Sequence, residues 1–314
     1  MPRPQGPVSL GWKTKGQFAR TVADYSLIDG PALTLRRTVV ETGYAGVDGG
    51  RLYYETSGEG PALVLIHAGF LDSRMWDTQF KLFSESYRVI RYDVRGFGKS
   101  DVARTKFSDY KDLRGLLDHL RVKTASLVGV SNGGRIASDF AVEYPSMVDR
   151  LVLVSPGIAG YKSSVPEEEK LWEEFERQMK PQEDADREGR AADAVEMDVD
   201  AWASAQTPAN RERITQIAMD NFHVHVENPW KLQVPPEPRT FQRLSQIRIP
   251  TLLIIGDRDV PAQILMVDNV HSHIPGSKKV LIRGADHIVN MSKPDEFNRT
   301  VLEFLKQQTQ EIRA

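Results

Sequence analysis

The chain has 314 residues, of which 40% are hydrophobic and 27% are charged, and its 41 Lys and Arg nearly balance its 43 Asp and Glu. This balance gives no sign of the basic surface that binds nucleic acid or a charged membrane. No apolar run approaches the ~18 residues of a membrane span, and the absence of cysteine excludes disulfides, thiolate metal ligands and a cysteine nucleophile. We therefore expect a globular cytoplasmic protein with neither a nucleic-acid nor a membrane partner.

Residues 1–34 carry Pro, Gly and scattered charge without periodicity, and we expect an extension that precedes the fold. Two strands are expected next, at 36–42 and 51–56, on either side of a turn at 47–50. Further apolar runs of strand length follow at 62–67, 87–93, 124–130, 149–155, 250–256 and 278–283. Helical patterns lie between most of these strands, and a helix is expected to close the chain at 291–310. This alternation predicts an α/β fold whose central sheet is mostly parallel and carries helices on both faces.

The longest interruption of the strand pattern, at 158–247, has helical periodicity of its own. We expect residues 35–157 and 248–314 to form the core that contains the sheet, and 158–247 to form a helical insertion. The simplest role for the large aromatic residues of this insertion is to fill its own core. We favour that role for Trp172, whereas the sequence does not decide the role of Trp202.

Ser131 lies in the sequence Gly-Val-Ser-Asn-Gly, between a short apolar strand and a helical pattern. Gly129 and Gly133 fit a sharp strand-to-helix turn, because a side chain at either position would clash where the chain folds back on itself. Such a turn presents Ser131 at the carboxyl end of its strand, next to the free backbone N–H groups of the helix N-terminus. The spacing predicts a serine nucleophile. The alternative is a tight junction in which Ser131 has no chemical role.

A serine nucleophile needs a base and a group that orients the base. Asp257 and Asp259 directly follow the apolar run at 250–256, and His287 follows the run at 278–283. The carboxyl ends of parallel strands meet at one edge of a sheet, which is where the ligand sites of open α/β sheets lie. The order Ser, Asp, His along the chain is that of an α/β-hydrolase triad.

Five loop motifs carry a family resemblance. They are 67–70 (His-Ala-Gly-Phe), 93–100 (D-x-R-G-x-G-x-S), 129–133 (G-x-S-x-G), 256–261 (Gly-Asp-Arg-Asp-Val-Pro) and 284–287 (Gly-Ala-Asp-His). In combination they resemble the α/β-hydrolase fold superfamily, in its capped, esterase- and lactonase-like branch, from about residue 39 to the C-terminus. The resemblance implies that the helical insertion is a cap over Ser131. Two departures are Ala68, where glycine is commoner, and an acid loop that reaches its proline sooner than in many members.

The resemblance also implies a division of roles. Ser131 attacks a carbonyl carbon, His287 accepts the serine proton and returns it to the leaving group, and an aspartate orients His287. The backbone N–H groups of Phe70 and Asn132 form the oxyanion hole. This chemistry requires no cofactor and no metal.

Asp257 and Asp259 compete for the role of the acid. The resemblance favours Asp259, which lies three residues past Gly256, at the spacing where the family places its acid. Asp257 comes directly after the strand, and its simplest role is to open the turn by accepting backbone hydrogen bonds. We therefore expect a triad of Ser131, Asp259 and His287.

The remaining histidines are weaker candidates for the base. His271 and His273 lie in a polar stretch, and His67 belongs to the oxyanion loop, where a histidine more often braces the turn. His223 and His225 form an H-x-H pair, a spacing that suits two metal ligands. No clear third or fourth ligand lies nearby in the sequence, so we interpret both as polar or packing side chains.

Two classes of function follow. The first is a serine hydrolase that cleaves an ester or lactone bond of a small molecule through an acyl-enzyme intermediate. Carbon–carbon bond hydrolysis of a diketone and perhydrolase or acyl-transfer chemistry use the same triad and stay open as alternatives. The second class is a non-catalytic ligand-binding protein on this fold. Haloalkane dehalogenase and epoxide hydrolase are disfavoured because both need an aspartate where Ser131 stands, and a homo-oligomer is compatible with the sequence.

Overall fold

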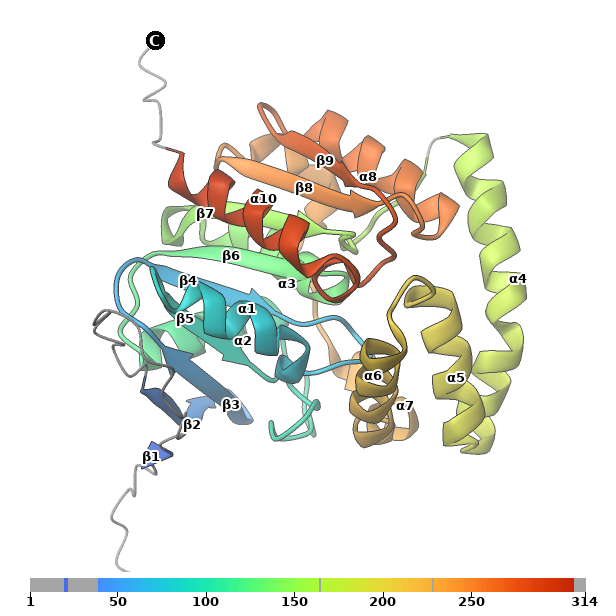
Figure 1. Cartoon of the computed structure of the whole chain (residues 1–314), viewed down its shortest axis with the longest axis horizontal. Helices are drawn as coiled ribbons and strands as arrows, with labels where there is room; N and C mark the ends of the chain where they lie inside the picture. Colours follow the sequence, from blue (N-terminus) through green and yellow to red (C-terminus); the bar gives the residue numbers. More distant parts are fainter. Residues whose placement is uncertain (1–19, 22–38, 164, 228, 308–314) are drawn as a thin grey trace, which may run out of the picture.

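A computed structural model describes residues 20–21, 39–163, 165–227 and 229–307, and a nine-stranded sheet runs through its centre (Figure 1). The strand order is β1-β2-β3-β5-β4-β6-β7-β8-β9. The strands are β1 (Arg20–Thr21), β2 (Val40–Val47), β3 (Gly50–Ser57), β4 (Ala62–Ile66), β5 (Arg88–Tyr92), β6 (Ala125–Val130), β7 (Val148–Val154), β8 (Thr251–Gly256) and β9 (Lys278–Ile282). The helices of the core are α1 (Asp77–Phe83), α2 (Asp109–His119), α3 (Asn132–Glu143), α8 (Pro261–His273), α9 (Val289–Ser292) and α10 (Pro294–Lys306), with the 3-10 turns η1 (Ser73–Trp76) and η2 (Pro145–Met147).

The sheet is mostly parallel. The neighbours β5, β4, β6, β7, β8 and β9 all pair in parallel. At the other end, β3 pairs antiparallel with β5, and β2 and β1 extend the sheet as further antiparallel strands. This topology confirms the α/β fold class expected from the alternation of strands and helices.

Alternate residues of the central strands face two hydrophobic clusters, one on each side of the sheet. In β4, Val64 and Ile66 belong to one cluster, and Leu63 and Leu65 belong to the other. Helices α2, α3 and α8 contribute to the first cluster, and α1 and α10 contribute to the second, so both faces are covered (Figure 1). Burial on both faces explains why these strands are continuous apolar runs without polar alternation.

The first part of the chain departs from expectation. The strand expected at 36–42 is wrong in its bounds, because the pairing of β2 with β3 continues to the pair Val47–Gly50, and only Asp48 and Gly49 (φ 72°) form the turn. Residues 36–38 lie outside the described part of the chain. The expected extension, 1–34, also lies outside it, apart from the two residues of β1.

The single closing helix expected at 291–310 is wrong in its bounds, because the structure divides it into two helices. Helix α9 ends at Ser292 and α10 begins at Pro294, because proline has no N–H to continue a helix from the turn before it but suits the first turn of a new one. Residues 308–310 lie outside the described chain. The apolar face expected for this helix is buried; its members are Phe297, Val301, Phe304 and Leu305.

The segment between β7 and β8 forms a helical layer beyond the carboxyl ends of the parallel strands (Figure 1). We call this layer the cap. It contains α4 (Pro166–Glu188), α5 (Ala191–Trp202), α6 (Pro208–Asp220), α7 (His223–Glu227), η3 (Pro229–Leu232) and η4 (Thr240–Gln246). Among the described residues, no helix is both long enough and apolar enough to cross a membrane.

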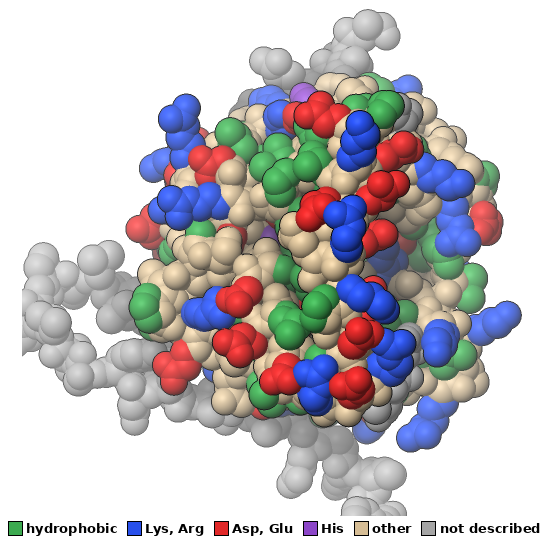
Figure 2. Space-filling model, turned by 90° about the vertical axis from the view of Figure 1, so that its right-hand side faces the viewer, with side chains coloured by type: hydrophobic (Ala, Val, Ile, Leu, Met, Phe, Trp, Pro, Cys, Tyr) green, Lys and Arg blue, Asp and Glu red, His purple; other side chains and the backbone are tan. Residues whose placement is uncertain are grey.

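The outward face of the cap mixes charges of both signs (Figure 2). On α4, Glu174 pairs with Arg177, and Lys180 lies within salt-bridge distance of Glu183 and Asp184. Solvent-exposed pairs of this kind contribute little to stability. They pair some of the acidic side chains of α4 with neighbouring Lys and Arg, while the helix as a whole stays acidic.

A second group of ionisable side chains lies in the interior of the cap, partly or fully buried. Asp198 of α5 is only 7% exposed, and Gln182 Nε2 of α4 donates to it at 3.3 Å and to Asp186 at 2.6 Å. His225 Nδ1 of α7 lies 3.1 Å from the Asp186 carboxylate. Burial, and then the nearby Asp186, raise the pKa of Asp198 to about 7. The folded protein therefore holds a proton on Asp198 that the unfolded chain releases near pH 4.

This difference predicts that Asp198 lowers the free energy of unfolding as the pH rises from about 4 to 7, by on the order of 4 kcal/mol in full. The Asp198→Asn variant stays neutral, so we expect its Tm to exceed that of the wild type at pH 8 and to match it near pH 4. Thermal melts across this pH range measure the effect. The exposed Asp200, on the same helix, provides the control variant Asp200→Asn; an equal gain for Asp198→Asn at both ends of the range contradicts the prediction.

Candidate active site

Ser131 occupies the turn between the central strand β6 and helix α3. Its backbone has φ 54° and ψ −115°, a left-handed conformation that non-glycine residues rarely adopt. A Cβ atom at Gly129 would lie 2.2 Å from the Gly133 carbonyl oxygen, and one at Gly133 would lie 2.2 Å from the Ile66 carbonyl oxygen. The two glycines are therefore required by close backbone packing, and the strained turn holds Ser131 at the carboxyl edge of the sheet.

His287 and Asp259 meet at the same edge, in the loops that follow β9 and β8. His287 Nδ1 lies 2.9 Å from Asp259 Oδ1 and 3.0 Å from Asp259 Oδ2, and both residues are buried. Asp259 Oδ1 also accepts a hydrogen bond from the Val260 N–H at 2.7 Å. A carboxylate on Nδ1 keeps the proton there, which leaves Nε2 of the neutral imidazole free to accept another.

Asp257 has a different partner. It is exposed, and its Oδ1 accepts a hydrogen bond from the Gly284 N–H at 2.5 Å, so it ties the acid loop to the histidine loop. The structure thus places Asp259, and not Asp257, against His287. In the described part of the chain, no hydrogen bond joins the Ser131 hydroxyl to His287; such pairs often tighten only when substrate binds.

The loop after β4 lies against the first residue of α3. A Cβ atom at Gly69 would lie 3.3 Å from Asn132 Cβ. Within the described residues, the backbone N–H groups of Phe70 and Asn132 have no hydrogen-bond partner. For Asn132 this is usual, because it begins helix α3. Two free N–H donors on adjoining backbone segments beside Ser131 are suited to a developing negative charge.

His67 fixes the shape of this loop. Its Nδ1 lies 2.8 Å from the Ala68 carbonyl oxygen, and its Nε2 accepts a hydrogen bond from the Val94 N–H at 2.8 Å. Because Nε2 must be the acceptor, the proton lies on Nδ1 and the ring is neutral. Complete burial lowers the pKa of His67, which agrees with this neutral state. His67 therefore braces two loops.

The other histidines have separate partners. His223 Nε2 lies 2.9 Å from the Gly96 carbonyl oxygen, whereas His225 pairs with Asp186. His271 contacts Ser277, and His273 contacts the Asn269 carbonyl. Among the described residues, no group of three or more His, Cys, Asp or Glu side chains is arranged to hold a metal ion.

An ion cluster beneath the nucleophile turn was not foreseen from the sequence. Arg135 of α3 donates to the Asn132 side chain at 2.9 Å, to Asp139 at 3.0 Å and to Asp109 at 2.5 Å. Burial raises the pKa of Asp139 to about 6. Thr240 of the cap donates to Asp139 as well. The cluster therefore joins α3, the start of α2 and the end of the cap.

Contacts between the cap and the histidine loop were also not foreseen. The ring centroids of Trp202 and His287 lie 4.5 Å apart, with the planes tilted by 50°. The neighbouring Asp286 accepts hydrogen bonds from the Ala205 N–H at 2.9 Å and from Gln206 Nε2 at 2.9 and 3.1 Å. A tryptophan at the end of a helical pattern carries no sequence signal for such a contact, because the contact depends on how the cap docks.

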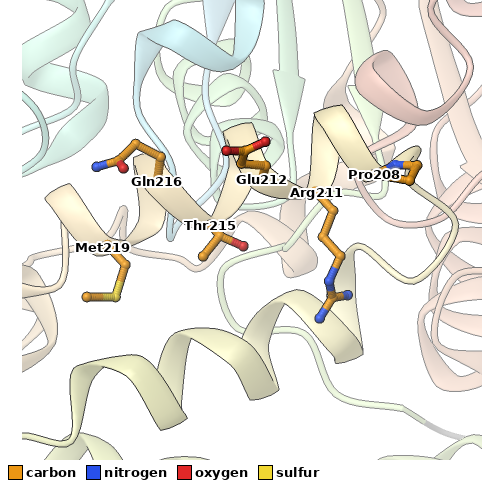
Figure 3. A pocket seen from close by; sticks show the side chains of 6 residues that line it. All are labelled: Pro208, Arg211, Glu212, Thr215, Gln216 and Met219. Carbon is orange, nitrogen blue, oxygen red and sulfur yellow. The ribbon is translucent and has the colours of Figure 1, made fainter.

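Two surface hollows are lined by residues other than those of the candidate triad. A volume of about 410 Å³ lies along α6, lined by side chains of that single helix (Figure 3). Its lining residues are Pro208, Arg211, Glu212, Thr215, Gln216 and Met219. A second hollow, of about 260 Å³, lies among charged side chains that include Asp72, Arg74 and Lys99. Neither hollow is lined by Ser131 or His287.

Comparison with known families matches residues 61–294 to a model described as the alpha/beta hydrolase fold. The chain belongs to the alpha/beta hydrolase fold family. It is 31% identical over 277 residues to a 2-hydroxy-6-oxononadienedioate/2-hydroxy-6-oxononatrienedioate hydrolase of Burkholderia vietnamiensis (strain G4 / LMG 22486), covering 82% of this chain and 91% of that one. It is 27% identical over 281 residues to the 2-hydroxy-6-oxo-6-phenylhexa-2,4-dienoate hydrolase of Comamonas testosteroni, with coverage of 82% and 91%.

Among solved structures, the enol-lactonase from Burkholderia xenovorans LB400 is similar to this alpha/beta hydrolase, with a TM-score of 0.68 and 25% identity. The similarity covers 84% of this chain and all of that one. Family membership, together with relatives that are hydrolases by name, shows that the protein is an enzyme of the hydrolase type.

The contrast between the two aspartates predicts different effects on this alpha/beta hydrolase. Asp259→Asn leaves the fold intact but no longer holds the proton on His287 Nδ1, and the serine-protease precedent for this change is a loss of about 10⁴ in kcat. Asp257→Asn removes only a loop contact, so we expect kcat to stay within about threefold of the wild type. Steady-state kinetics and melting curves of both variants test this. Full turnover in Asp259→Asn, with loss in Asp257→Asn, would reverse the assignment.

Proposed function

We propose that this alpha/beta hydrolase is a serine hydrolase that cleaves an ester or lactone bond of a small molecule through an acyl-enzyme intermediate. The observation that carries the proposal is the hydrogen-bonded pair of His287 and Asp259, held at the sheet edge where a strained turn presents Ser131. Nucleophile, base and orienting acid are each supplied by a different loop at this edge. Their arrangement supports the serine mechanism.

In the first half of the reaction, Ser131 Oγ bonds to the substrate carbonyl carbon as its proton passes to His287 Nε2. The carbonyl oxygen becomes negatively charged and is stabilised by the N–H groups of Phe70 and Asn132, each typically worth about 2.7–4 kcal/mol of the barrier. Asp259 stabilises the charged imidazolium. The tetrahedral intermediate then expels the alkoxide, which takes the proton from His287 and leaves as an alcohol.

In the second half, His287 accepts a proton from water, and the resulting hydroxide attacks the acyl carbon. Collapse of this second intermediate breaks the bond to Ser131 Oγ and returns the proton to it. With a lactone, the alcohol stays attached to the acyl group, so only one product leaves. The similarity to an enol-lactonase supports the inclusion of lactones.

Carbon–carbon bond hydrolysis is the second candidate for the reaction. The observation that favours it is the 31% identity to a hydrolase whose named substrate is an oxo acid without an ester group. The same serine, base and oxyanion donors serve that chemistry, as they serve perhydrolase and acyl-transfer reactions. A ligand-binding protein that retains the triad without turnover is the remaining alternative.

These alternatives predict different outcomes in one experiment. The purified protein is assayed against short p-nitrophenyl esters, a series of lactones and a 1,5-diketone acid, and it is treated with a fluorophosphonate probe. We expect hydrolysis of esters or lactones and a label on Ser131, because the turn exposes an activated hydroxyl. The Ser131→Ala variant is the control and takes no label.

The readouts separate the candidates. Turnover of the diketone acid alone supports the carbon–carbon reaction against the ester reaction. Labelling of Ser131 without turnover of any substrate class supports Ser131 as a nucleophile but contradicts the assignment of esters and lactones as substrates. Absence of both label and turnover contradicts the hydrolytic mechanism and favours the ligand-binding alternative.

A further inference from the structure

One short segment of the cap contacts two consecutive residues of the histidine loop. Helix α5 ends at Trp202 and α6 begins at Pro208, and the residues between them cross over the loop. Trp202 packs on the ring of His287, and Ala205 and Gln206 bind Asp286. We call residues 202–206 the cap latch.

The cap latch supplies most of the hydrogen bonds of a buried charge. Asp286 is 1% exposed, and burial raises the pKa of its carboxyl group. Its partners are neutral donors: the N–H groups of Ala205 and Ile288, the amide of Gln206 and the hydroxyl of Ser292. In the described part of the chain, it has no ion-pair partner. A buried carboxylate is costly without such donors, so separation of the latch from the loop is unfavourable.

Trp202 restrains His287, the residue that follows Asp286 in the histidine loop. Asp259 holds one edge of the His287 ring through Nδ1, while the indole of Trp202 packs against the ring itself. Phe175 of α4 contacts Trp202 in turn, with ring centroids 4.8 Å apart. The imidazole is therefore restrained by two independent parts of the protein, one in the core and one in the cap.

We propose that the cap latch is a positioning element for His287: Trp202 restrains the imidazole ring and Gln206, through Asp286, fixes the loop that carries it. The inference rests on the proposed function of His287 as the base. The latch keeps Nε2 directed at the Ser131 hydroxyl through both proton transfers. On this basis the cap latch positions the base, and this part of the cap does more than cover the substrate.

The test compares two amide side chains of the same cap region. Gln206→Ala removes the bonds to Asp286, next to the base. Asn210→Ala removes a cap-to-core bond of the same kind, in which Asn210 Nδ2 donates to the Met291 carbonyl at 2.7 Å, without touching Asp286 or His287. Both variants are measured for Tm, kcat and KM with the best ester or lactone substrate of the wild type.

We expect Gln206→Ala to lower kcat by about 10- to 100-fold, because a misplacement of about 1 Å has effects of that size, with KM changed by less than about threefold. The acid limb of its kcat/KM profile shifts as well, since that limb reports the titration of the base in the free enzyme. Asn210→Ala is expected to lower Tm to a similar degree and to keep both kcat and the position of the acid limb.

Trp202 gives a second, independent measurement. Trp202→Ala is expected to lower kcat by about tenfold or more, and Trp202→Phe, which keeps an aromatic ring, to restore most of it. Trp172→Ala is the matched control, because Trp172 bonds to Glu168 and contacts Phe175 at 6.0 Å between ring centroids, so that Phe175 and Trp202 both lie between it and His287. Because Trp172 is partly buried, its truncation should lower Tm and leave kcat unchanged.

Wild-type turnover is measured first and tests the hydrolase proposal by itself. Given turnover, full kcat in both Gln206→Ala and Trp202→Ala overturns the role of the latch and leaves the triad standing. An equal loss of kcat in Asn210→Ala or Trp172→Ala also overturns it, because the effect would then follow from general loosening of the cap. Should Gln206→Ala fail to fold, the Trp202 series decides the matter.

Discussion

The strained turn at Ser131 is the constraint on which the site depends. A serine at φ 54° costs on the order of 1–3 kcal/mol relative to ordinary backbone, and only surrounding structure can hold it there. Strand β6 supplies part of that support, since it is fully buried and paired on both sides with β4 and β7. The Ser131 N–H also donates to the Val154 carbonyl at 2.9 Å, which ties the turn to the neighbouring strand.

The buried ions around Arg135 support the other side of the turn. Arg135 holds the side chain of Asn132, whose backbone N–H is one of the two candidate oxyanion donors. Its charge is balanced by Asp109 and Asp139, and the latter is bound by Thr240 from the end of the cap. Breaking a buried pair by removing one partner leaves an uncompensated charge, so this cluster resists local opening. Both flanks of the nucleophile turn are thus fixed by interactions that are mostly buried.

The fold and the site differ in how far the sequence predicts them. The alternation of apolar strands and helical patterns was sufficient to predict the sheet. Because short motifs follow the ends of these strands, the sequence also predicted that Ser131 and His287 lie at one edge of the sheet. The bounds of β2 depend on how far its pairing with β3 continues, and the helix break before Pro294 depends on the missing proline N–H. The pattern of apolar residues encodes neither. The sequence left the role of Trp202 undecided because its partner, His287, lies on a loop that Trp202 meets only after the cap and core have packed together. The cluster around Arg135 was missed because Asp109 reaches it only when α2 packs against α3.

The buried carboxylate of Asp286 has a consequence for the evolution and engineering of this protein. The cap is inserted between two neighbouring strands of the core, β7 and β8, so its exchange as a module is an obvious design. A transplanted cap without donors equivalent to Ala205 and Gln206 would leave the buried carboxylate of Asp286 without most of its hydrogen bonds, next to His287. The unit that can be inherited or grafted intact is therefore the cap together with the histidine loop, although Gln206 and Asp286 are 80 positions apart in the chain.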